Sequence, residues 1–149
     1  MANWYGNART NYVRVKDVEA LRNFLDGFSI QIHVHPTHPD FVMLSPHDLS
    51  DSGGFEMSAY NEDDEEINLC WASDVAPHLC EGQVLIINEV GWEKLRYLSG
   101  SVGVVTWDGR EEWMSLGKFA EEALDRLQVP QGNVAEPIYQ NLPKALAAA

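Results

Sequence analysis

The sequence predicts a single-domain α+β protein with a mostly antiparallel or mixed sheet of about five to seven strands and two main helices. Three observations lead to this prediction. The chain has 149 residues, of which 45% are hydrophobic, as in one ordinary globular domain. Short segments of strand-like alternation recur along it, and two segments instead carry apolar residues at helical spacing. We expect residues 1–128 to form the domain and residues 129–149 to be a loosely packed C-terminal tail.

The N-terminal part of the chain predicts a strand, a helix and a hairpin, in that order. Residues 10–15 alternate as in a strand, and Asp17 is placed to cap the helix that follows. Residues 29–35 alternate cleanly between apolar and polar side chains. Two prolines in residues 36–39 then enforce a turn, and residues 41–44 read as the returning strand.

The middle of the chain predicts shorter elements around a charged turn. Residues 55–60 have the pattern of a strand. Residues 61–66 are too charged to be buried, so we expect a solvated turn or the start of a short helix there. Residues 67–71 fit either a strand or a helix. Ser73 is expected to cap a short helix that runs to Leu79.

The next part predicts the centre of the sheet. Residues 83–90 are apolar on both sides of the strand at its centre, which is typical of a strand in the middle of a sheet. Residues 95–107 form another strand region. Gly100 and Gly103 interrupt that region and indicate a bulge or a tight turn.

The last predicted elements are a hairpin and the best helix of the chain. The Asp-Gly pair at residues 108–109 is a strong hairpin signal, with residues 110–114 as the returning strand. Ser115 is placed as the N-cap of a helix, and on its outer side Glu122 and Arg126 are spaced to form an ion pair. The helix carries one continuous apolar stripe, which consists of Leu116, Phe119, Ala120, Ala123, Leu124 and Leu127.

The composition excludes several classes of protein. Cys70 and Cys80 are the two cysteines, which favours free thiols in a reducing compartment over a secreted disulfide scaffold. The N-terminus lacks the pattern of a signal peptide. The longest dense apolar run, residues 84–87, is far shorter than the about 20 residues that span a bilayer. We therefore expect a cytoplasmic protein with no membrane contact.

Charge is distributed very unevenly along the chain. Residues 23–93 contain fourteen carboxylates and no Lys or Arg, so that segment carries −14 and the flanks sum to +1 (the net −13 minus −14). Such a field repels nucleic acid and attracts basic surfaces. A solvated face that promotes solubility is the simpler interpretation. The residues that we expect to act as phosphate surrogates are Asp48, Asp51, Glu56, Glu62, Asp63, Asp64, Glu65 and Glu66.

Three stretches of the sequence carry a resemblance to known proteins. They are residues 3–6 leading to residues 11–17, then Gly-Trp-Glu-Lys-Leu-Arg-Tyr at residues 91–97, and the glycine-containing strand at residues 100–105. Together they resemble a group of short acidic accessory proteins encoded on bacterial plasmids, integrative elements and phages. No catalytic residue set comes with this resemblance. What it implies is a mobile-element context, in which small acidic proteins often disable restriction or CRISPR machinery.

The histidines form a candidate metal site. His33 and His35 share one face of a strand, His38 and His47 follow closely, and imidazole is a common zinc ligand. The chain contains neither a Cys-x-x-Cys nor a His-Glu-x-x-His motif. Exposed or partly buried histidines on a polar strand face are therefore the simpler interpretation.

The remaining candidates are cysteines, aromatic residues and arginines. Nothing around Cys70, His78 and Cys80 resembles a nucleophile motif, so small buried side chains are the simpler interpretation. Trp4 and Tyr5 lie outside any clear element and are the expected anchors of an aromatic interface. The tryptophans expected in the core are Trp71, Trp92, Trp107 and Trp113. The arginines expected to pair with neighbouring carboxylates are Arg96 and Arg110.

The sequence therefore predicts a non-enzymatic protein without catalytic residues, cofactor or direct nucleic-acid contact. The leading hypothesis is a mobile-element protein whose acidic, nucleic-acid-like surface binds and inhibits a basic nucleic-acid-binding host complex. One alternative is a regulatory or structural protein-binding module with an aromatic interface, with a homodimer left open. The other is a metal-dependent enzyme at His33 and His35.

Overall fold

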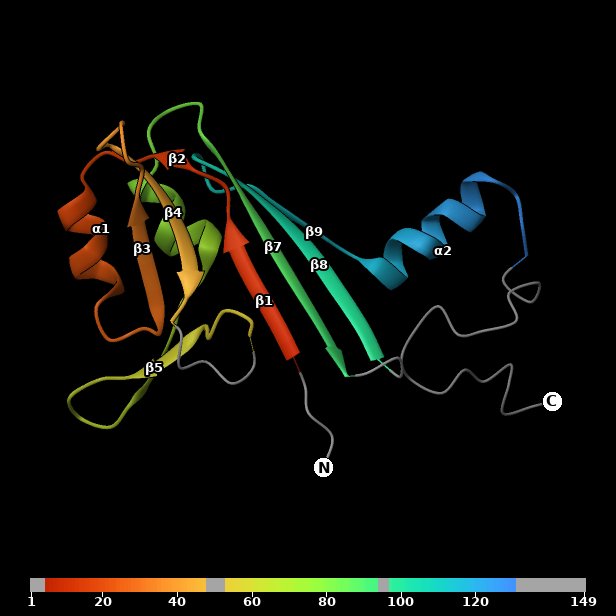
Figure 1. Cartoon of the computed structure of the whole chain (residues 1–149), viewed down its shortest axis with the longest axis horizontal. Helices are drawn as coiled ribbons and strands as arrows, with labels where there is room; N and C mark the ends of the chain where they lie inside the picture. The colour runs from red at the N-terminus through yellow and green to blue at the C-terminus, as the bar shows by residue number, and fades with distance from the viewer. Residues whose placement is uncertain (1–4, 48–52, 94–96, 131–149) are drawn as a thin grey trace.

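The computed structural model describes residues 5–47, 53–93 and 97–130 and shows one α+β domain (Figure 1). Two α-helices, α1 (Val18–Leu25) and α2 (Leu116–Arg126), and two short helices, η1 (Trp71–Val75) and η2 (Ala76–His78), accompany nine strands in these residues. The strands are β1 (Tyr5–Thr10), β2 (Val13–Arg14), β3 (Ile30–Val34), β4 (Phe41–Pro46), β5 (Ser58–Tyr60), β6 (Glu66–Asn68), β7 (Val84–Glu93), β8 (Tyr97–Thr106) and β9 (Glu111–Ser115).

The α+β class, the single domain and the two main helices are confirmed. The strands, however, divide over three antiparallel sheets instead of forming one sheet of five to seven strands. The largest has the order β1-β7-β8-β9, the second β2-β4-β3, and the third is the β5-β6 hairpin. The predicted C-terminal tail lies outside the described residues except for its first two positions and stays a prediction.

The strand predicted at residues 10–15 is two strands, because the chain changes sheets at Asn11. The Asn11 side chain accepts a hydrogen bond from the Ile86 amide at 2.8 Å and donates to the Val84 carbonyl at 3.0 Å. It therefore pairs with backbone groups at the start of β7, beyond the end of β1. β1 begins earlier than predicted, at Tyr5, which pairs with Trp92. Pairing with β7 stabilises residues 5–10 as a strand, although their own sequence does not predict one.

Thr10 joins the two larger sheets. Its side chain is fully buried, and its hydroxyl accepts a hydrogen bond from the Leu44 amide of β4 at 2.8 Å. The same hydroxyl donates to the Asn11 carbonyl at 2.9 Å. The hydrogen bond between the Leu44 amide and the Thr10 hydroxyl therefore satisfies one buried polar group on β4 and one on β1.

The helix after Asp17 is confirmed, and its cap has the expected form. The Asp17 carboxylate accepts hydrogen bonds from the Glu19 and Ala20 amides, and α1 buries Leu21 and Leu25.

The predicted cap at Ser73 is wrong, because the helix begins earlier, at Trp71. Cys70 occupies the cap position, and its backbone amide donates a hydrogen bond to the Asp74 carboxylate at 2.7 Å. Burial of the Trp71 ring, whose edge contacts Phe55 at a centroid distance of 5.0 Å, draws the chain into this earlier turn.

β7 lies between β1 and β8, so its predicted place in the middle of the sheet is confirmed. Its inner side chains Leu85 and Ile87 are completely buried, as is Val105 of β8. Its outer side is not covered: Ile86, between those two residues, is 37% exposed. A strand that is apolar on both sides therefore buries only one of them here.

The predicted bulge or turn at Gly100 and Gly103 is wrong, because β8 keeps an unbroken register with β7 from end to end. The two glycines make room for side chains instead. A Cβ atom on Gly103 would stand 2.6 Å from the Trp113 ring, and one on Gly100 would stand 3.1 Å from Leu116.

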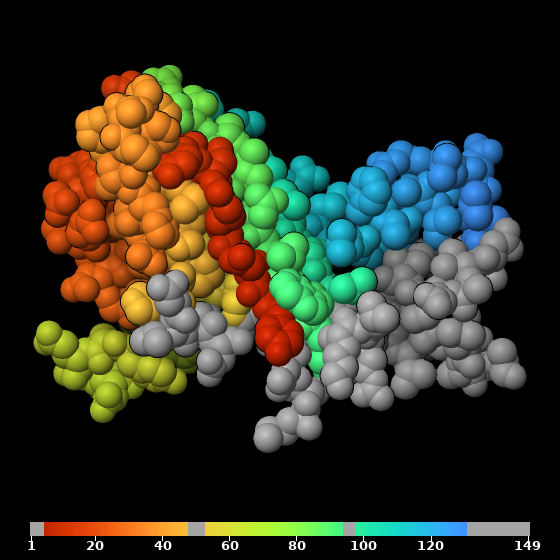
Figure 2. Space-filling view, in the orientation of Figure 1, coloured from red at the N-terminus to blue at the C-terminus, as the bar shows by residue number. Residues whose placement is uncertain are grey.

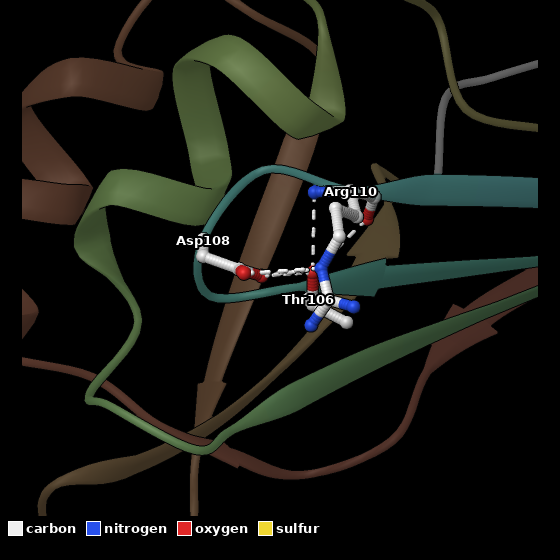
Figure 3. A network of polar contacts seen from close by, with 3 residues as sticks. All are labelled: Thr106, Asp108 and Arg110. Atoms are coloured by element: carbon white, nitrogen blue, oxygen red, sulfur yellow. Dashed lines mark hydrogen bonds and ion pairs between the residues drawn. The ribbon is translucent and has the colours of Figure 1, made fainter.

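The Asp108-Gly109 turn is confirmed, with Gly109 at φ +84° (Figure 3). The Asp108 carboxylate accepts hydrogen bonds from the Thr106 hydroxyl and from Arg110 Nε. The Thr106 hydroxyl, and to a smaller extent Arg110, lower the pKa of Asp108 below its usual value. The expected pairing of Arg110 with a neighbouring carboxylate is confirmed, whereas Arg96 lies outside the described residues.

The Ser115 cap of α2 is confirmed, since the Ser115 hydroxyl accepts a hydrogen bond from the Lys118 amide at 3.1 Å. The expected Glu122–Arg126 pair is not formed. Glu122 instead lies 4.0 Å from Lys118, and Arg126 stands over the Phe119 ring at 5.8 Å. α2 follows the β8–β9 hairpin away from the rest of the domain and contains no buried residue (Figure 1).

We expect Thr10→Val to lower the free energy of unfolding by about 1–3 kcal/mol, because the buried Leu44 amide then loses its acceptor. Chemical denaturation measures this loss. Thr10→Ser keeps the hydroxyl and should cost less than Thr10→Val. Equal losses in both variants would contradict a role for the hydrogen bond.

We expect Gly103→Ala to destabilise the protein by about 1–3 kcal/mol, because its Cβ would overlap the Trp113 ring in a packed layer. Gly100→Ala is the matched control, since the neighbouring Leu116 side chain is flexible and can move aside. Thermal unfolding followed by circular dichroism should rank Gly103→Ala below Gly100→Ala, and the reverse order would refute this packing account.

Candidate functional site: an acidic hairpin and an apolar sheet face

The acidic cluster of residues 62–66 lies at the end of the β5–β6 hairpin, which projects from the body of the domain (Figure 1). All five of these carboxylate residues are exposed. The expectation of a solvated turn is confirmed, with Glu66 as the first residue of β6. We call these five residues the acidic turn.

Asn61 holds the backbone of the acidic turn in one conformation. Its side-chain oxygen accepts hydrogen bonds from the amides of Asp63 and Glu65, both at 2.9 Å. Its side-chain nitrogen donates to the Glu65 carboxylate at 3.1 Å. Asp64 adopts a positive φ of 58°, a conformation that Asp and Asn tolerate better than most residues. The sequence signal for this arrangement is Asn61 itself, because Asn favours turns of this kind.

No basic side chain pairs with the acidic turn within the described ranges. The ion pairs there are Arg14–Asp40, Arg22–Glu19, Arg110–Asp108 and Lys118–Glu122. The acidic turn therefore presents its negative charge to solvent, with no Lys or Arg of the described residues paired to it.

Other carboxylates of the acidic middle segment have structural partners. Arg14 lies 2.7 Å from Asp40, and its hydrogen bond lowers the pKa of that carboxyl. Glu89 accepts the Phe55 amide at 3.2 Å. Glu56 is exposed shortly before β5. The other two proposed phosphate surrogates, Asp48 and Asp51, lie outside the described residues.

The histidines are only partly brought together. His33 Nε2 lies 2.7 Å from the Ser45 hydroxyl. The rings of His35 and His38 contact each other edge to face, with centroids 4.9 Å apart. Among the residues that the structure describes, no group of three or more His, Cys, Asp or Glu side chains is arranged to hold a metal ion.

The cysteines and His78 have separate surroundings, and both thiols are free. Cys70 is exposed, and a hydrogen bond from the Ser73 hydroxyl lowers the pKa of its thiol, with further help from nearby backbone amides. The His78 ring packs on Phe24 at a centroid distance of 5.1 Å. Its pKa is lowered mainly by burial and secondarily by the charge of Lys16.

The second candidate surface is the side of the four-stranded sheet that faces away from the core, which we call the outer face. Seven large apolar residues on it are between 37% and 63% exposed. The strand registers align them in cross-strand rows, so they form one continuous patch. Its large apolar members are Tyr5, Ile86, Val90, Trp92, Leu98, Val102 and Val104.

An aromatic pair stands at one end of the outer face. The rings of Tyr5 and Trp92 stack with centroids 6.0 Å apart and planes inclined by 26°. The expected exposure of Tyr5 is confirmed, and Trp4 lies outside the described residues. The expected burial of Trp92 is wrong, because this side of β7 is uncovered. Trp71 is buried as expected, whereas Trp107 and Trp113 are partly buried against the core.

α2 borders the outer face and leaves a groove beside it. Leu116 packs on Gly100, and the groove of about 310 Å³ runs between the strands and the helix, where Val90, Val102 and Phe119 line it. Leu116 and Phe119 are both more than half exposed. Figure 2 shows α2 standing apart from the rest of the domain, with a hollow between them. The apolar stripe of α2 therefore continues the outer face.

Comparison with known proteins adds no family. No family model, no curated protein and no solved structure matches this chain. The resemblance to acidic mobile-element proteins stays a prediction. Within the described ranges, no helix is long and apolar enough to cross a membrane. What the fold and its surfaces define is a small acidic α+β protein with an acidic turn and a separate apolar face.

We expect Ser73→Ala to raise the pKa of the Cys70 thiol toward its ordinary value, because the thiolate loses its main hydrogen-bond donor. Alkylation of Cys70 at neutral pH should slow several-fold, since the thiolate is the reactive form. Mass spectrometry of time-resolved iodoacetamide labelling measures the rate, with Cys80 in the same molecule as the internal control. Equal slowing at both cysteines would indicate a general structural change instead.

Proposed function

We propose that the protein is a non-enzymatic binding protein whose acidic turn engages a basic, nucleic-acid-binding surface of a partner protein and blocks it. The observation that carries this proposal is the acidic turn itself. Five consecutive carboxylate residues are exposed at the end of a projecting hairpin, and none of them has a cationic partner among the described residues.

Electrostatics favours a basic partner over any other. Proteins that bind duplex nucleic acid carry tracks of Lys and Arg that match its phosphates. A net charge of −13 attracts such a surface, and charge complementarity mainly raises the rate of association. Because the projecting hairpin holds the charge away from the body, it can enter a channel or groove that the whole domain cannot.

The fixed conformation of the turn strengthens this proposal. A flexible acidic segment loses conformational entropy when it binds, whereas a turn already held by Asn61 loses less. Inhibition of a restriction or CRISPR complex, which the resemblance implies, is one form that this activity would take.

A second candidate function is a regulatory or structural protein-binding module with an aromatic interface. The stacked and exposed Tyr5–Trp92 pair favours it, because tyrosine and tryptophan dominate the energetics of protein interfaces. Binding of this kind would persist at high salt and would be lost on Trp92→Ala.

We expect Glu62→Lys combined with Asp63→Lys to reduce partner capture by about tenfold or more, because the charge that meets the basic surface is reversed. Tagged protein would be incubated with nuclease-treated bacterial lysate, washed at low and then high salt, and the eluate identified by mass spectrometry. The captured protein should be basic, should leave at high salt and should be displaced by added duplex DNA or RNA.

The matched control is Glu81→Lys combined with Asp125→Lys, which changes the net charge equally at exposed sites away from the turn. Asn61→Ala changes no charge and should weaken capture less than the reversal. Capture that is unchanged in the Glu62→Lys/Asp63→Lys variant, or reduced equally in the control, would rule out the acidic turn as the binding site.

A further inference from the structure

The outer face is larger than the apolar patches that an isolated domain normally exposes. The exposed parts of its seven large apolar residues and of Leu116 and Phe119 on α2 sum to on the order of 800 Å², which is about what each partner of a standard interface buries. Patches of this size mark binding sites. The face therefore has the area that one protein partner needs.

Charge on the outer face is sparse and has a definite arrangement. Among its described positions on the four strands, Arg9 and Glu112 are the charged ones. Arg9 lies on β1 and Glu112 on β9, the two edge strands of the sheet. Neither forms an ion pair within the described residues, although four other pairs are present there.

The strand registers give the relative height of these two residues. Arg9 pairs with Asn88, Asn88 with Val102, and Val102 with Met114, so these four residues form one row across the sheet. Glu112 is two residues from Met114, which corresponds to about 7 Å along the strand. The positive and the negative charge therefore stand on opposite edges at nearly the same height.

A half-turn about an axis parallel to the strands brings two copies of this sheet face to face and places β1 of each copy over β9 of the other. Arg9 of one copy then lies opposite the Glu112 edge of the other, and the symmetry repeats the contact. Face-to-face sheets pack about 10 Å apart, with their strands inclined by about 30°. A long arginine side chain can span this separation together with the difference in height between Arg9 and Glu112.

We propose that the outer face binds a second copy of this chain, forming a two-fold symmetric dimer in which Arg9 of each copy pairs with Glu112 of the other. The same half-turn brings the β1 end that carries Tyr5 toward the start of α2 on the other copy. The exposed Leu116 and Phe119 side chains then cover the Tyr5–Trp92 pair, which accounts for an amphipathic helix without a buried residue.

The dimer goes beyond the proposed function and does not depend on it. The β5–β6 hairpin belongs to a different sheet, so a dimer formed through the outer face carries two acidic turns. Two linked binding elements raise the apparent affinity for an extended basic surface. Salt separates the two activities, because burial of apolar area persists at high salt whereas capture through the acidic turn is lost.

Sedimentation equilibrium of the purified chain tests the dimer. The expected mass is twice the 16.7 kDa of one chain at micromolar concentration, and it should be retained in 1 M NaCl (about 3 Å Debye length). A monomer at all concentrations would overturn the proposal, as would a mass that keeps growing beyond the dimer, since an isologous interface closes at two copies.

Val102→Lys places a charge in the centre of the outer face and should weaken the dimer by about a hundredfold, as expected for a charge buried without a partner. Ile67→Lys is the matched control, because Ile67 is similarly exposed but lies on β6, and it should leave the dimer unchanged. Circular dichroism verifies that both variants fold. A folded Val102→Lys variant that dimerises like the unmodified chain would place the interface elsewhere.

A charge exchange tests the symmetric arrangement directly. Arg9→Glu alone should weaken the dimer by about tenfold, because two ion pairs become two repulsive contacts. Arg9→Glu combined with Glu112→Arg should restore it, since the pairs re-form with reversed polarity. Failure of the double variant to recover would overturn the Arg9–Glu112 pairing, whatever the result of the capture experiment with the acidic turn.

Discussion

The fold depends on the complete burial of three side chains on one side of the β7–β8 hairpin. Leu85, Ile87 and Val105 have no exposed surface, and β1 and β9 pair along the two edges of this hairpin. Because side chains alternate along a strand, burying these residues turns Ile86, Val90 and their neighbours to the opposite side. Thr10 then connects this sheet to β4. The core on this side also contains residues of α1 and of the two short helices η1 and η2.

This one-sided burial separates two kinds of surface on the molecule. The outer face is apolar and nearly uncharged, whereas the acidic turn stands on a hairpin of another sheet. Apolar association persists in salt, while attraction between opposite charges is screened over about 8–10 Å. The proposed dimer and the proposed basic partner would therefore use different surfaces and would not compete with each other.

Local features were predictable because neighbouring residues create them. Asp17 and Ser115 cap their helices through amides two or three residues away, and the Asp-Gly turn is held by Thr106 and Arg110, which flank it in the sequence. The predictions of a helix cap at Ser73 and of a bulge at the two glycines of β8 were wrong because residues distant in the sequence decide the structure there. The burial of Trp71 set the start of η1, and the Trp113 ring requires the space at Gly103.

By itself, the sequence determined the α+β class, most of the elements and the charge of residues 62–66, since periodicity, capping and composition are local properties. The tertiary structure decided how those elements are arranged. The strands form three sheets instead of one, Trp92 is exposed, and the apolar stripe of α2 lies beside an uncovered face of the sheet. Periodicity reveals that a side of a strand is apolar, but only the arrangement of the other elements decides whether that side is covered.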